Sequence, residues 1–278
     1  MLLDGTPRAD GAGTLRALLL AAHPGPAFGV TVMVGVLALA VGLEPVTAVL
    51  VVAAVLTGQL SIGWSNDLID LARDRRTGRS DKPLATGAIA PGPVRVACRS
   101  VLAATVVLSL ALGWLPGGAQ LVSVAAGWAY NLRLKATIWS WLPYAVAFGA
   151  LAAVPSLALP VVDVPWWQPV VGALLGVGAH LLNVLPDLED DAATGVAGLP
   201  HRLAARVGAT GVAALAVVLL LTATGLLLAA VPRGPGVWLT AGLVVGLAVL
   251  ALVRSGRTPF RAAMAIALVD VVLLAVAL

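Results

Sequence analysis

Charge is scarce in this 278-residue chain. Only 11% of its residues are Asp, Glu, Lys or Arg, whereas 60% are hydrophobic, and its mean hydropathy is +1.01. A soluble domain carries about 25% charged residues, so this chain cannot bury its apolar surface in one water-soluble core. The composition excludes a soluble enzyme, a secreted module and a disordered protein, and it predicts an integral membrane protein.

Cysteine is almost absent as well. The single Cys98 excludes an intramolecular disulfide and a cysteine-based metal site. The sequence also lacks a glycine-rich nucleotide loop, a catalytic triad and zinc-ligand spacing. A net charge of +4 and a pI near 10.0 could suggest a nucleic-acid partner. In a membrane protein the same excess is better explained by topology, and we expect no nucleic-acid partner.

Apolar runs of about 20 residues, the length that crosses a bilayer, recur along the chain. They predict an all-α, polytopic membrane protein with about nine transmembrane helices, near 15–42, 46–71, 94–114, 117–133, 138–158, 166–187, 208–231, 236–253 and 260–278. We expect the polar residues 1–14 to form a flexible N-terminus before a single transmembrane domain at 15–278. The first run is too long for the apolar region of a signal peptide, so we expect it to be retained.

The basic residues indicate the orientation. With nine spans, 16 of the 17 Lys and Arg fall on the side of the N-terminus, and Arg233 is the exception. Positive loops stay in the cytoplasm. The pattern therefore predicts a cytoplasmic N-terminus and cytoplasmic basic loops, in the plasma or inner membrane of the cell.

Eight of the 13 acidic residues fall in two stretches, 66–83 and 183–200. At an offset of 117 residues the two stretches are identical at 8 of 18 positions, which indicates an internal repeat. Both stretches follow helices that run towards the cytoplasm, so the repeat is of the parallel type.

The spacing within each stretch places oxygen ligands on one helix face. Asn66, Asp70 and Asp74 recur every four residues, Asp67 extends their stripe, and the second stretch repeats the pattern in Asn183, Asp187 and Asp191. Facing carboxylates repel one another unless cations lie between them. Oxygen ligands favour Mg²⁺, with Mn²⁺ as the alternative.

Basic residues follow both acidic stripes and the predicted helix at 117–133. The set comprises Arg73, Arg79, Lys82, Arg133, Lys135 and Arg202. Metal-binding carboxylates ringed by cations would bind a diphosphate, and above a membrane bundle the rest of that substrate would be a lipid tail. We therefore predict ionisation of an allylic diphosphate, with the cations stabilising the leaving pyrophosphate. Arg254, Arg257 and Arg261 are interpreted as topology signals and lipid contacts.

Together these motifs resemble those of the UbiA superfamily of intramembrane prenyltransferases, nine-helix proteins with Asp-rich motifs at the cytoplasmic ends of helices 2 and 6. The first motif, NDxxDxxxD, is complete in Asn66, Asp67, Asp70 and Asp74, and its basic-Pro-Leu element matches Lys82-Pro83-Leu84. The second motif matches Asp187, Asp191, Gly195 and Leu199-Pro200, and a Tyr and Lys after helix 4 match Tyr130 and Lys135.

The resemblance implies a Mg²⁺-dependent transfer of an isoprenyl group from its diphosphate to an aromatic or quinone-precursor acceptor. We expect Asp67, Asp70 and Asp187 to be catalytic. The expected metal ligands are Asn66, Asp67, Asp70, Asp74, Asn183, Asp187 and Asp191, and the expected substrate-binding residues are Arg73, Arg79, Lys82, Lys135, Tyr130, Tyr144, Gln59 and His180.

Several of these residues have an alternative interpretation. Gln59 and His180 each lie seven residues before a motif residue, so each can face the substrate or bond between helices. Tyr144 lies beside Trp139 and Trp141, which suits either an interfacial aromatic belt or an active-site wall that stabilises a carbocation. We expect Asp270 to be paired structurally.

The second motif departs from the family pattern. Many members with aromatic acceptors have Lys-Asp where this chain has Asn183-Val184, and Asp190 replaces a Gly. These changes put the acceptor in doubt and favour an alternative, a UbiA-type terpene cyclase that closes the carbocation on itself. A transporter of an anionic solute is less favoured, because transporter sites lie near the membrane midplane and these carboxylates gather at one interface.

Overall fold

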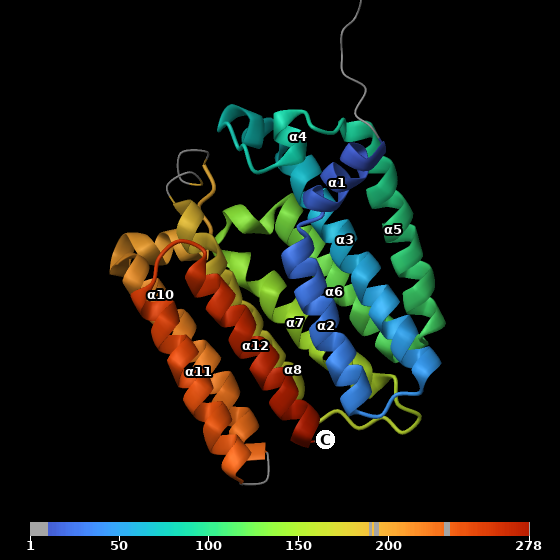
Figure 1. Cartoon of the computed structure of the whole chain (residues 1–278), viewed down its shortest axis with the longest axis vertical. Helices are drawn as coiled ribbons and strands as arrows, with labels where there is room; N and C mark the ends of the chain where they lie inside the picture. Colours follow the sequence, from blue (N-terminus) through green and yellow to red (C-terminus); the bar gives the residue numbers. More distant parts are fainter. Residues whose placement is uncertain (1–10, 189–190, 192–194, 231–233, 278) are drawn as a thin grey trace, which may run out of the picture.

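The computed structural model describes residues 11–188, 191, 195–230 and 234–277, and the described part is helical without a strand. Its α-helices are α1 (Gly11–Ala21), α2 (Pro24–Ala40), α3 (Pro45–Arg76), α4 (Pro83–Thr86), α5 (Pro91–Ala111), α6 (Trp114–Leu132), α7 (Leu142–Leu157), α8 (Trp167–Val184), α10 (Leu199–Ala230), α11 (Pro235–Val253) and α12 (Thr258–Ala277) (Figure 1). Three 3₁₀ turns complete it: η1 (Leu134–Ala136), η2 (Ile138–Trp141) and η3 (Leu185–Asp187).

The all-helical membrane fold is confirmed. Six helices in the described ranges are long and apolar enough to cross a membrane alone, and the bent pair α1–α2 would make a seventh. The nine predicted spans nevertheless each correspond to a helix of 16 residues or more. Gly208 breaks α10 with φ 72°, so its long second part begins where the seventh span was predicted.

The prediction of one continuous helix over 15–42 is wrong. The chain bends by 65° between α1 and α2, at His23, which precedes Pro24 and Pro26. A proline lacks the backbone N–H that would continue a helix and disfavours helical backbone at the residue before it. The helix α1 begins at Gly11, within the segment 1–14 predicted to be flexible, and residues 1–10 lie outside the described residues.

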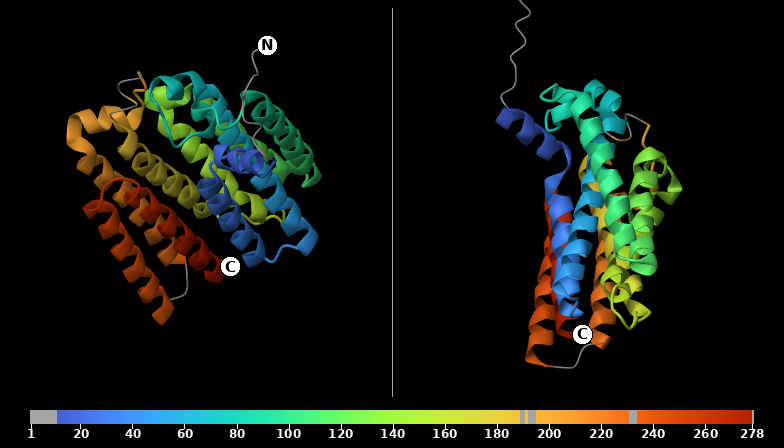
Figure 2. Two further views of the ribbon diagram at one scale, coloured as in Figure 1. Left: turned by 45° about the horizontal axis from the view of Figure 1, so that its top comes forward. Right: turned by 90° about the vertical axis from the view of Figure 1, so that its right-hand side faces the viewer.

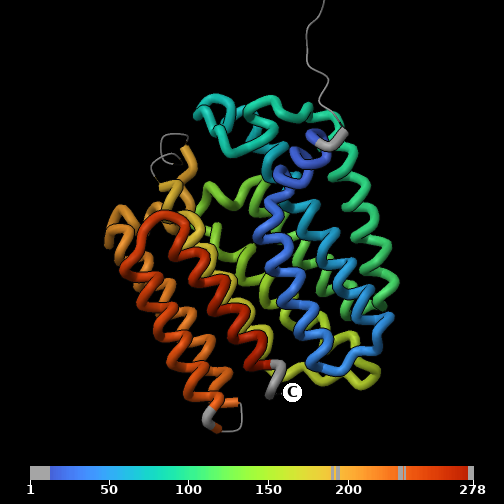
Figure 3. Tube along the Cα trace, in the orientation of Figure 1, coloured from blue at the N-terminus to red at the C-terminus, as the bar shows by residue number. Residues whose placement is uncertain are grey.

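The long helices run along one direction (Figures 1 and 2) and contact one another in a ring. Helix α3 packs against α2, α5 and α6, whereas α8 packs against α7, α10 and α12. The ring closes where α12 contacts α2, which brings segments more than 200 residues apart side by side (Figure 3). The end of the bundle that carries α1 and α4 also holds the C-terminal ends of α3 and α8.

Two glycines of α8 set its distance from α7. A Cβ at Gly172 would lie 2.5 Å from the Phe148 carbonyl oxygen, and one at Gly176 would lie 2.7 Å from that of Tyr144. Any side chain at these positions would push the helices apart. This close approach brings the aromatic face of α7 against His180 of α8.

Candidate active site

The first acidic motif lies on the last turns of α3. Asp67, Asp70 and Asp74 are almost fully buried, with 1%, 5% and 2% of their surface exposed. Burying three carboxylates costs free energy unless each one is paired. The chain supplies cationic partners from the loop after α3 and from the segment after α6.

Lys82 bridges two of these carboxylates. Its Nζ lies 3.1 Å from Asp67 Oδ1 and 2.9 Å from Asp74 Oδ2, and it donates a hydrogen bond to Asn66 Oδ1 at 3.3 Å. Burial lowers the pKa of the Lys82 ammonium, but the two carboxylates more than offset this, and the pKa lies above its usual value. Lys82 therefore stays charged between the aspartates.

Asp70 is held by two other cations. Lys135 of η1 donates a hydrogen bond to its Oδ1, and Arg73 Nη2 donates to its Oδ2 at 2.9 Å. Burial of the Lys135 side chain lowers its pKa below the usual value, although Asp70 acts in the opposite direction. Lys82 and Lys135 are the two lysines of the whole sequence, and both contact aspartates of this motif.

The second motif follows α8. Pro186 ends the regular helix, and the chain continues as the 3₁₀ turn η3, which contains Asp187. Asp187 Oδ1 lies 3.5 Å from Arg79 Nη1, and Asp191 Oδ2 lies 3.4 Å from His201 Nε2. Asp190 and Glu189 lie outside the described residues.

Arg79 connects the two motifs. Its guanidinium donates hydrogen bonds of 2.9 and 3.0 Å to Asp81 and also faces Asp187 from the loop after α3. The guanidinium holds the pKa of the Asp81 carboxyl well below its usual range, and the Arg79 pKa rises in turn. The ion pairs tie the end of α8 to the loop that carries Lys82.

A cavity of about 1050 Å³ opens between the motifs and continues into the bundle. It brings together residues predicted from the sequence, namely Gln59, Asn66, Asp67, Asp70, Arg73, Arg79, Lys82, Tyr130, Lys135, Tyr144, His180, Asn183, Asp187 and Asp191. Asp74 is not part of this lining, because it lies behind Lys82 and Arg73 as their partner. Charged side chains therefore gather at one end of a largely apolar cavity.

Aromatic rings form one wall of the cavity. Tyr144 stacks on His180 with ring centroids 4.5 Å apart, and Tyr130 meets Tyr144 edge to face at 5.1 Å. His180 Nε2 is hydrogen-bonded to Ser140 Oγ at 3.1 Å, which fixes its ring. Trp139 and Trp141 are not part of the cavity lining, so of the three aromatic residues predicted together only Tyr144 faces it.

The sequence reasoning missed His23. It is the one non-glycine residue with positive φ in the described ranges, at φ 52°, a strained conformation for such a side chain. Its Nε2 lies 2.8 Å from Asp67 Oδ1. Gly63 makes this possible, because a Cβ there would overlap the carbonyl oxygen of Ala22. The Pro-Gly-Pro that follows His23 is the signal that could have marked the bend.

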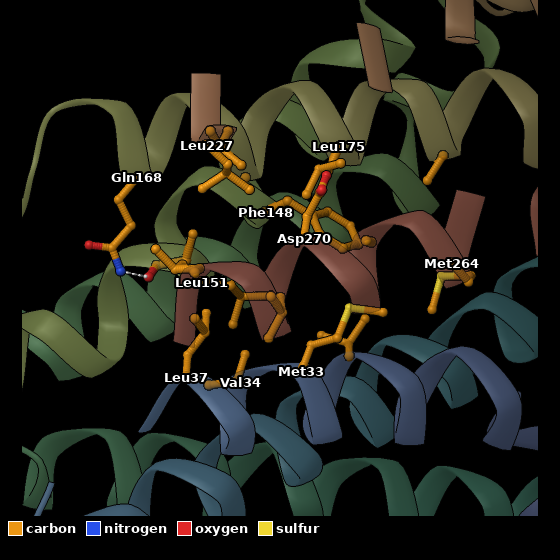
Figure 4. Close-up of a pocket in the computed structure, with 18 residues that line it drawn as sticks. Met33, Val34, Leu37, Phe148, Leu151, Gln168, Leu175, Leu227, Met264 and Asp270 are labelled. Carbon is orange, nitrogen blue, oxygen red and sulfur yellow. Dashed lines mark hydrogen bonds between the residues drawn. The ribbon is translucent and has the colours of Figure 1, made fainter. Parts of the chain in front are cut away.

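A second, smaller pocket of about 70 Å³ adjoins the cavity (Figure 4). It shares Met33, Phe148, Leu151 and Met264 with the main cavity. Its lining is apolar apart from Gln168, which donates to the Ala152 carbonyl, and Asp270. Asp270 Oδ2 accepts a hydrogen bond from Thr224 at 3.0 Å, as expected for a structural pair.

The carboxylate oxygens of the two motifs suit a hard metal ion that is bound jointly by the protein and by a substrate. Asp67 Oδ2 is buried and receives no hydrogen bond from any described residue, so this oxygen is available to a metal ion. Within the described ranges no three His, Cys, Asp or Glu side chains converge on one point. Mg²⁺ is commonly bound by one or two carboxylates together with substrate phosphates, which fits this arrangement.

A sequence model of the UbiA prenyltransferase family matches residues 28–273. The chain belongs to this family. No curated protein sequence matches it significantly. Solved structures of low sequence identity share the UbiA fold. One is a UbiA homologue from Archaeoglobus fulgidus bound to GPP and Mg²⁺. It has 16% identity and a TM-score of 0.66, and the match covers 94% of this chain and 100% of that one.

Two further structures have the same UbiA fold. An apo UbiA homologue from Aeropyrum pernix K1 has 17% identity and a TM-score of 0.70, covering 94% of this chain and 97% of that one. A digeranylgeranylglyceryl phosphate synthase has 18% identity and a TM-score of 0.62, covering 95% and 97%. These likenesses show that this chain has the UbiA fold.

Proposed function

We propose that this protein is a Mg²⁺-dependent intramembrane prenyltransferase that moves an isoprenyl group from its diphosphate to an acceptor. The observation that carries the proposal is the cavity of about 1050 Å³ whose carboxylates and cations gather at one end while its walls are apolar. A diphosphate joined to a hydrocarbon tail has the same division between charged and apolar parts. The A. fulgidus homologues bound to GPP or DMAPP with Mg²⁺ support a substrate of this class.

In this proposal the two acidic motifs hold the metal ions and the basic residues hold the diphosphate. The ligands would come from Asn66, Asp67, Asp70, Asn183, Asp187 and Asp191, with Asp74 keeping Lys82 and Arg73 in place. Bound Mg²⁺ would neutralise the charge that develops on the leaving pyrophosphate. Lys82, Lys135, Arg73 and Arg79 would exchange part of their carboxylate contacts for phosphate oxygens.

The reaction would break the bond between C1 of the isoprenyl chain and the diphosphate oxygen, and the electron pair would leave with pyrophosphate. A nucleophilic atom of the acceptor would then bond to C1 and lose its proton. The rings of Tyr130 and Tyr144 would stabilise the allylic cation through their faces. The apolar walls would keep water from reaching it, with Gln59 and His180 lining the route of the tail.

The terpene cyclase remains the second candidate. The aromatic wall of Tyr130, Tyr144 and His180 would stabilise positive charge away from C1, and Asn183 occupies the position where many family members have Lys. A cyclase would need no acceptor. For either reaction we propose that the carboxylate end of the bundle faces the cytoplasm of the cell's plasma or inner membrane, because the predicted spans assign 16 of the 17 Lys and Arg to that side.

The test uses the full-length protein in nanodiscs with C10, C15 and C20 allylic diphosphates, with and without Mg²⁺. Each donor is supplied alone and then with aromatic acceptors, and pyrophosphate and organic products are measured. Asp70→Asn should abolish turnover, while Asp163→Asn, which alters an exposed carboxylate before the first turn of α8 and so at the opposite end of that helix from the second motif, should not.

The products decide between the candidates. A metal-dependent prenylated product that forms only with an acceptor supports the transferase. A cyclic hydrocarbon or alcohol formed without an acceptor assigns the cyclase. Absence of pyrophosphate release from every donor, with intact folding, overturns both.

A further inference from the structure

The second pocket contains a carboxyl group that no step of the proposed reaction uses. Asp270 of α12 lines this pocket and has 1% of its surface exposed. It lies about 18 Å along the helix from Thr258, where α12 begins. Arg257, just before that start, pairs with Asp81 at the carboxylate end of the bundle. Asp270 is therefore deep in the bundle, away from both acidic motifs.

The surroundings of Asp270 do not suit a charged carboxylate. Among the described residues that line the pocket there is no Lys, Arg or His. The other polar side chain of the lining, Gln168, is already engaged, because its Nε2 donates to the Ala152 carbonyl at 2.7 Å and its Oε1 accepts from Ser156 at 3.0 Å. An ionised group without a cation in such a setting is very costly, which favours the neutral carboxyl.

The hydrogen bonds of Thr224 lead to the same conclusion. Thr224 Oγ1 lies 3.2 Å from the Leu220 carbonyl oxygen and 3.0 Å from Asp270 Oδ2. A hydroxyl group has one hydrogen to donate, so an ionised carboxylate would leave one of these contacts without a hydrogen. A carboxyl protonated at Oδ2 donates to Thr224, which then donates to Leu220. The neutral form therefore satisfies both contacts.

The other oxygen of Asp270 is left over. Oδ1 is buried and receives no hydrogen bond from a described residue. In the neutral carboxyl it is a carbonyl oxygen, which only accepts hydrogen bonds. A buried acceptor without a donor costs free energy, and an ionisable residue within a membrane helix that faces a cavity is a candidate functional group. Oδ1 is suited to a ligand that brings a neutral donor.

The size of the pocket restricts what can bring that donor. At about 70 Å³ it is smaller than the cavity of about 150 Å³ that holds one benzene molecule. Its shared walls, among them Met33, Phe148 and Met264, connect it to the main cavity. An occupant would therefore be the end of a longer molecule whose body lies in the main cavity.

We propose that Asp270 Oδ1 accepts a hydrogen bond from a hydroxyl group at the far end of an apolar chain bound in the main cavity. The inference rests on the proposed function and refines its substrate class to an isoprenoid whose tail ends in a hydroxyl group. A site that hydrogen-bonds a substrate hydroxyl discriminates against the analogue that lacks it. A single bound water has the same O–H chemistry, so the test separates water from a ligand hydroxyl.

The first measurement is equilibrium binding to the full-length protein in nanodiscs with Mg²⁺. Geranyl, farnesyl and geranylgeranyl diphosphate are each compared with the derivative that carries a hydroxyl group on the last carbon of the tail. For the tail length that reaches the pocket, wild type should bind the hydroxyl derivative at least as tightly as its parent. Asp270→Leu should lower the ratio of the two affinities about tenfold, the loss of one hydrogen bond.

A conservative variant separates the hydrogen bond from packing. In Asp270→Asn the amide nitrogen can donate to Thr224 while the amide oxygen still accepts, as in the neutral carboxyl. This variant should keep the preference for the hydroxyl derivative. Asp163→Asn, which alters an exposed carboxylate outside the pocket, should bind every probe as wild type does.

Infrared spectroscopy provides a measurement that does not depend on diphosphate binding. Wild type and Asp163→Asn should show the C=O band of a protonated carboxyl, and Asp270→Leu and Asp270→Asn should both lack it. Dodecanol should shift the band to lower frequency, because its hydroxyl group bonds to the carbonyl oxygen, whereas dodecane should not. If no diphosphate binds, the proposed function fails, and this measurement still decides the role of Asp270.

Three results would overturn the inference. In the first, every hydroxyl derivative binds more weakly than its parent in wild type, or the ratio is unchanged in Asp270→Leu. In the second, Asp270→Leu retains the full carboxyl band, so Asp270 is not neutral. In the third, hydration of a dried film shifts the band and no alcohol does, which assigns Oδ1 to a bound water.

Discussion

Replacing Lys82 with methionine should destabilise the protein far more without Mg²⁺ than with it. The ammonium lies 3.1 and 2.9 Å from two carboxylates that are almost fully buried. Methionine keeps much of the length and apolar stem of lysine and removes its charge. The variant therefore leaves Asp67 and Asp74 without the cation that lies between them.

The magnitude follows from the geometry. At about 3 Å and an effective dielectric constant of about 20, one such pair is worth roughly 5 kcal/mol before the cost of burying the charges. Removing one partner of a buried ion pair typically costs about 3–5 kcal/mol, because the remaining charge is left uncompensated. His23, 2.8 Å from Asp67, and Arg73, 3.7 Å from Asp74, compensate in part, so we expect a loss of about 3 kcal/mol.

The assay is the free energy of unfolding in bicelles, measured in EDTA and in saturating Mg²⁺. A metal ion bound by the same carboxylates would replace the lost charge, so the difference between Lys82→Met and wild type should shrink by at least half in Mg²⁺. Arg75→Met is the control, since Arg75 is exposed on the same helix end and forms no ion pair with a described residue. It should cost less than about 0.5 kcal/mol in either buffer.

Equal destabilisation of Lys82→Met in EDTA and Mg²⁺ would refute the reasoning, because it would show that no divalent ion binds where the ammonium was. A variant as stable as wild type in EDTA would refute it differently. That result would mean that the buried aspartates do not need Lys82 as their counter-charge.

Three other substitutions test separate parts of the structure. Gly63→Ala should lower the free energy of unfolding by about 1–3 kcal/mol in thermal unfolding and weaken Mg²⁺ binding, because the new methyl group displaces the bend at His23. Gly25→Ala is the control, because the space around Gly25 is open, and it should have neither effect. Lys135→Gln should weaken geranyl diphosphate binding about tenfold in equilibrium dialysis, and equal weakening by Arg133→Gln would show a general charge effect. Asp270→Leu should stabilise the protein by about 1 kcal/mol, because Asp270 Oδ1 is buried without a hydrogen bond from a described residue. The melting temperature should therefore rise, and a lower melting temperature would contradict this.

Helix positions and acidic spacing could be predicted because each depends on local sequence. Apart from the first span, the apolar runs predicted the spans to within a few residues of the helices. The four-residue spacing of Asn66, Asp70 and Asp74 determines a common helix face wherever the helix lies. These features do not require knowledge of what packs against the helix.

The bend at His23 and the roles of the arginines could not be predicted in the same way. A window of about 20 residues averages His23, Pro24 and Pro26 with the apolar residues on both sides of them, so one long span was expected where two helices occur. The contact of His23 with Asp67 joins residues 44 positions apart. Whether Arg261 lines the cavity depends on the rotation of α12 in the bundle, which the packing against α2 and α8 determines, and Arg254 precedes that helix at the end of α11.

The contact of both lysines with one group of aspartates makes the site chemically addressable in the intact protein. Reductive methylation with ¹³C-formaldehyde would label Lys82, Lys135 and the N-terminal amine, because the sequence contains no other lysine. Two side-chain NMR signals would then report on the carboxylate cluster without mutation. Adding Mg²⁺ and a diphosphate would show directly, as changes in shift and in labelling rate, when each ammonium leaves its aspartates.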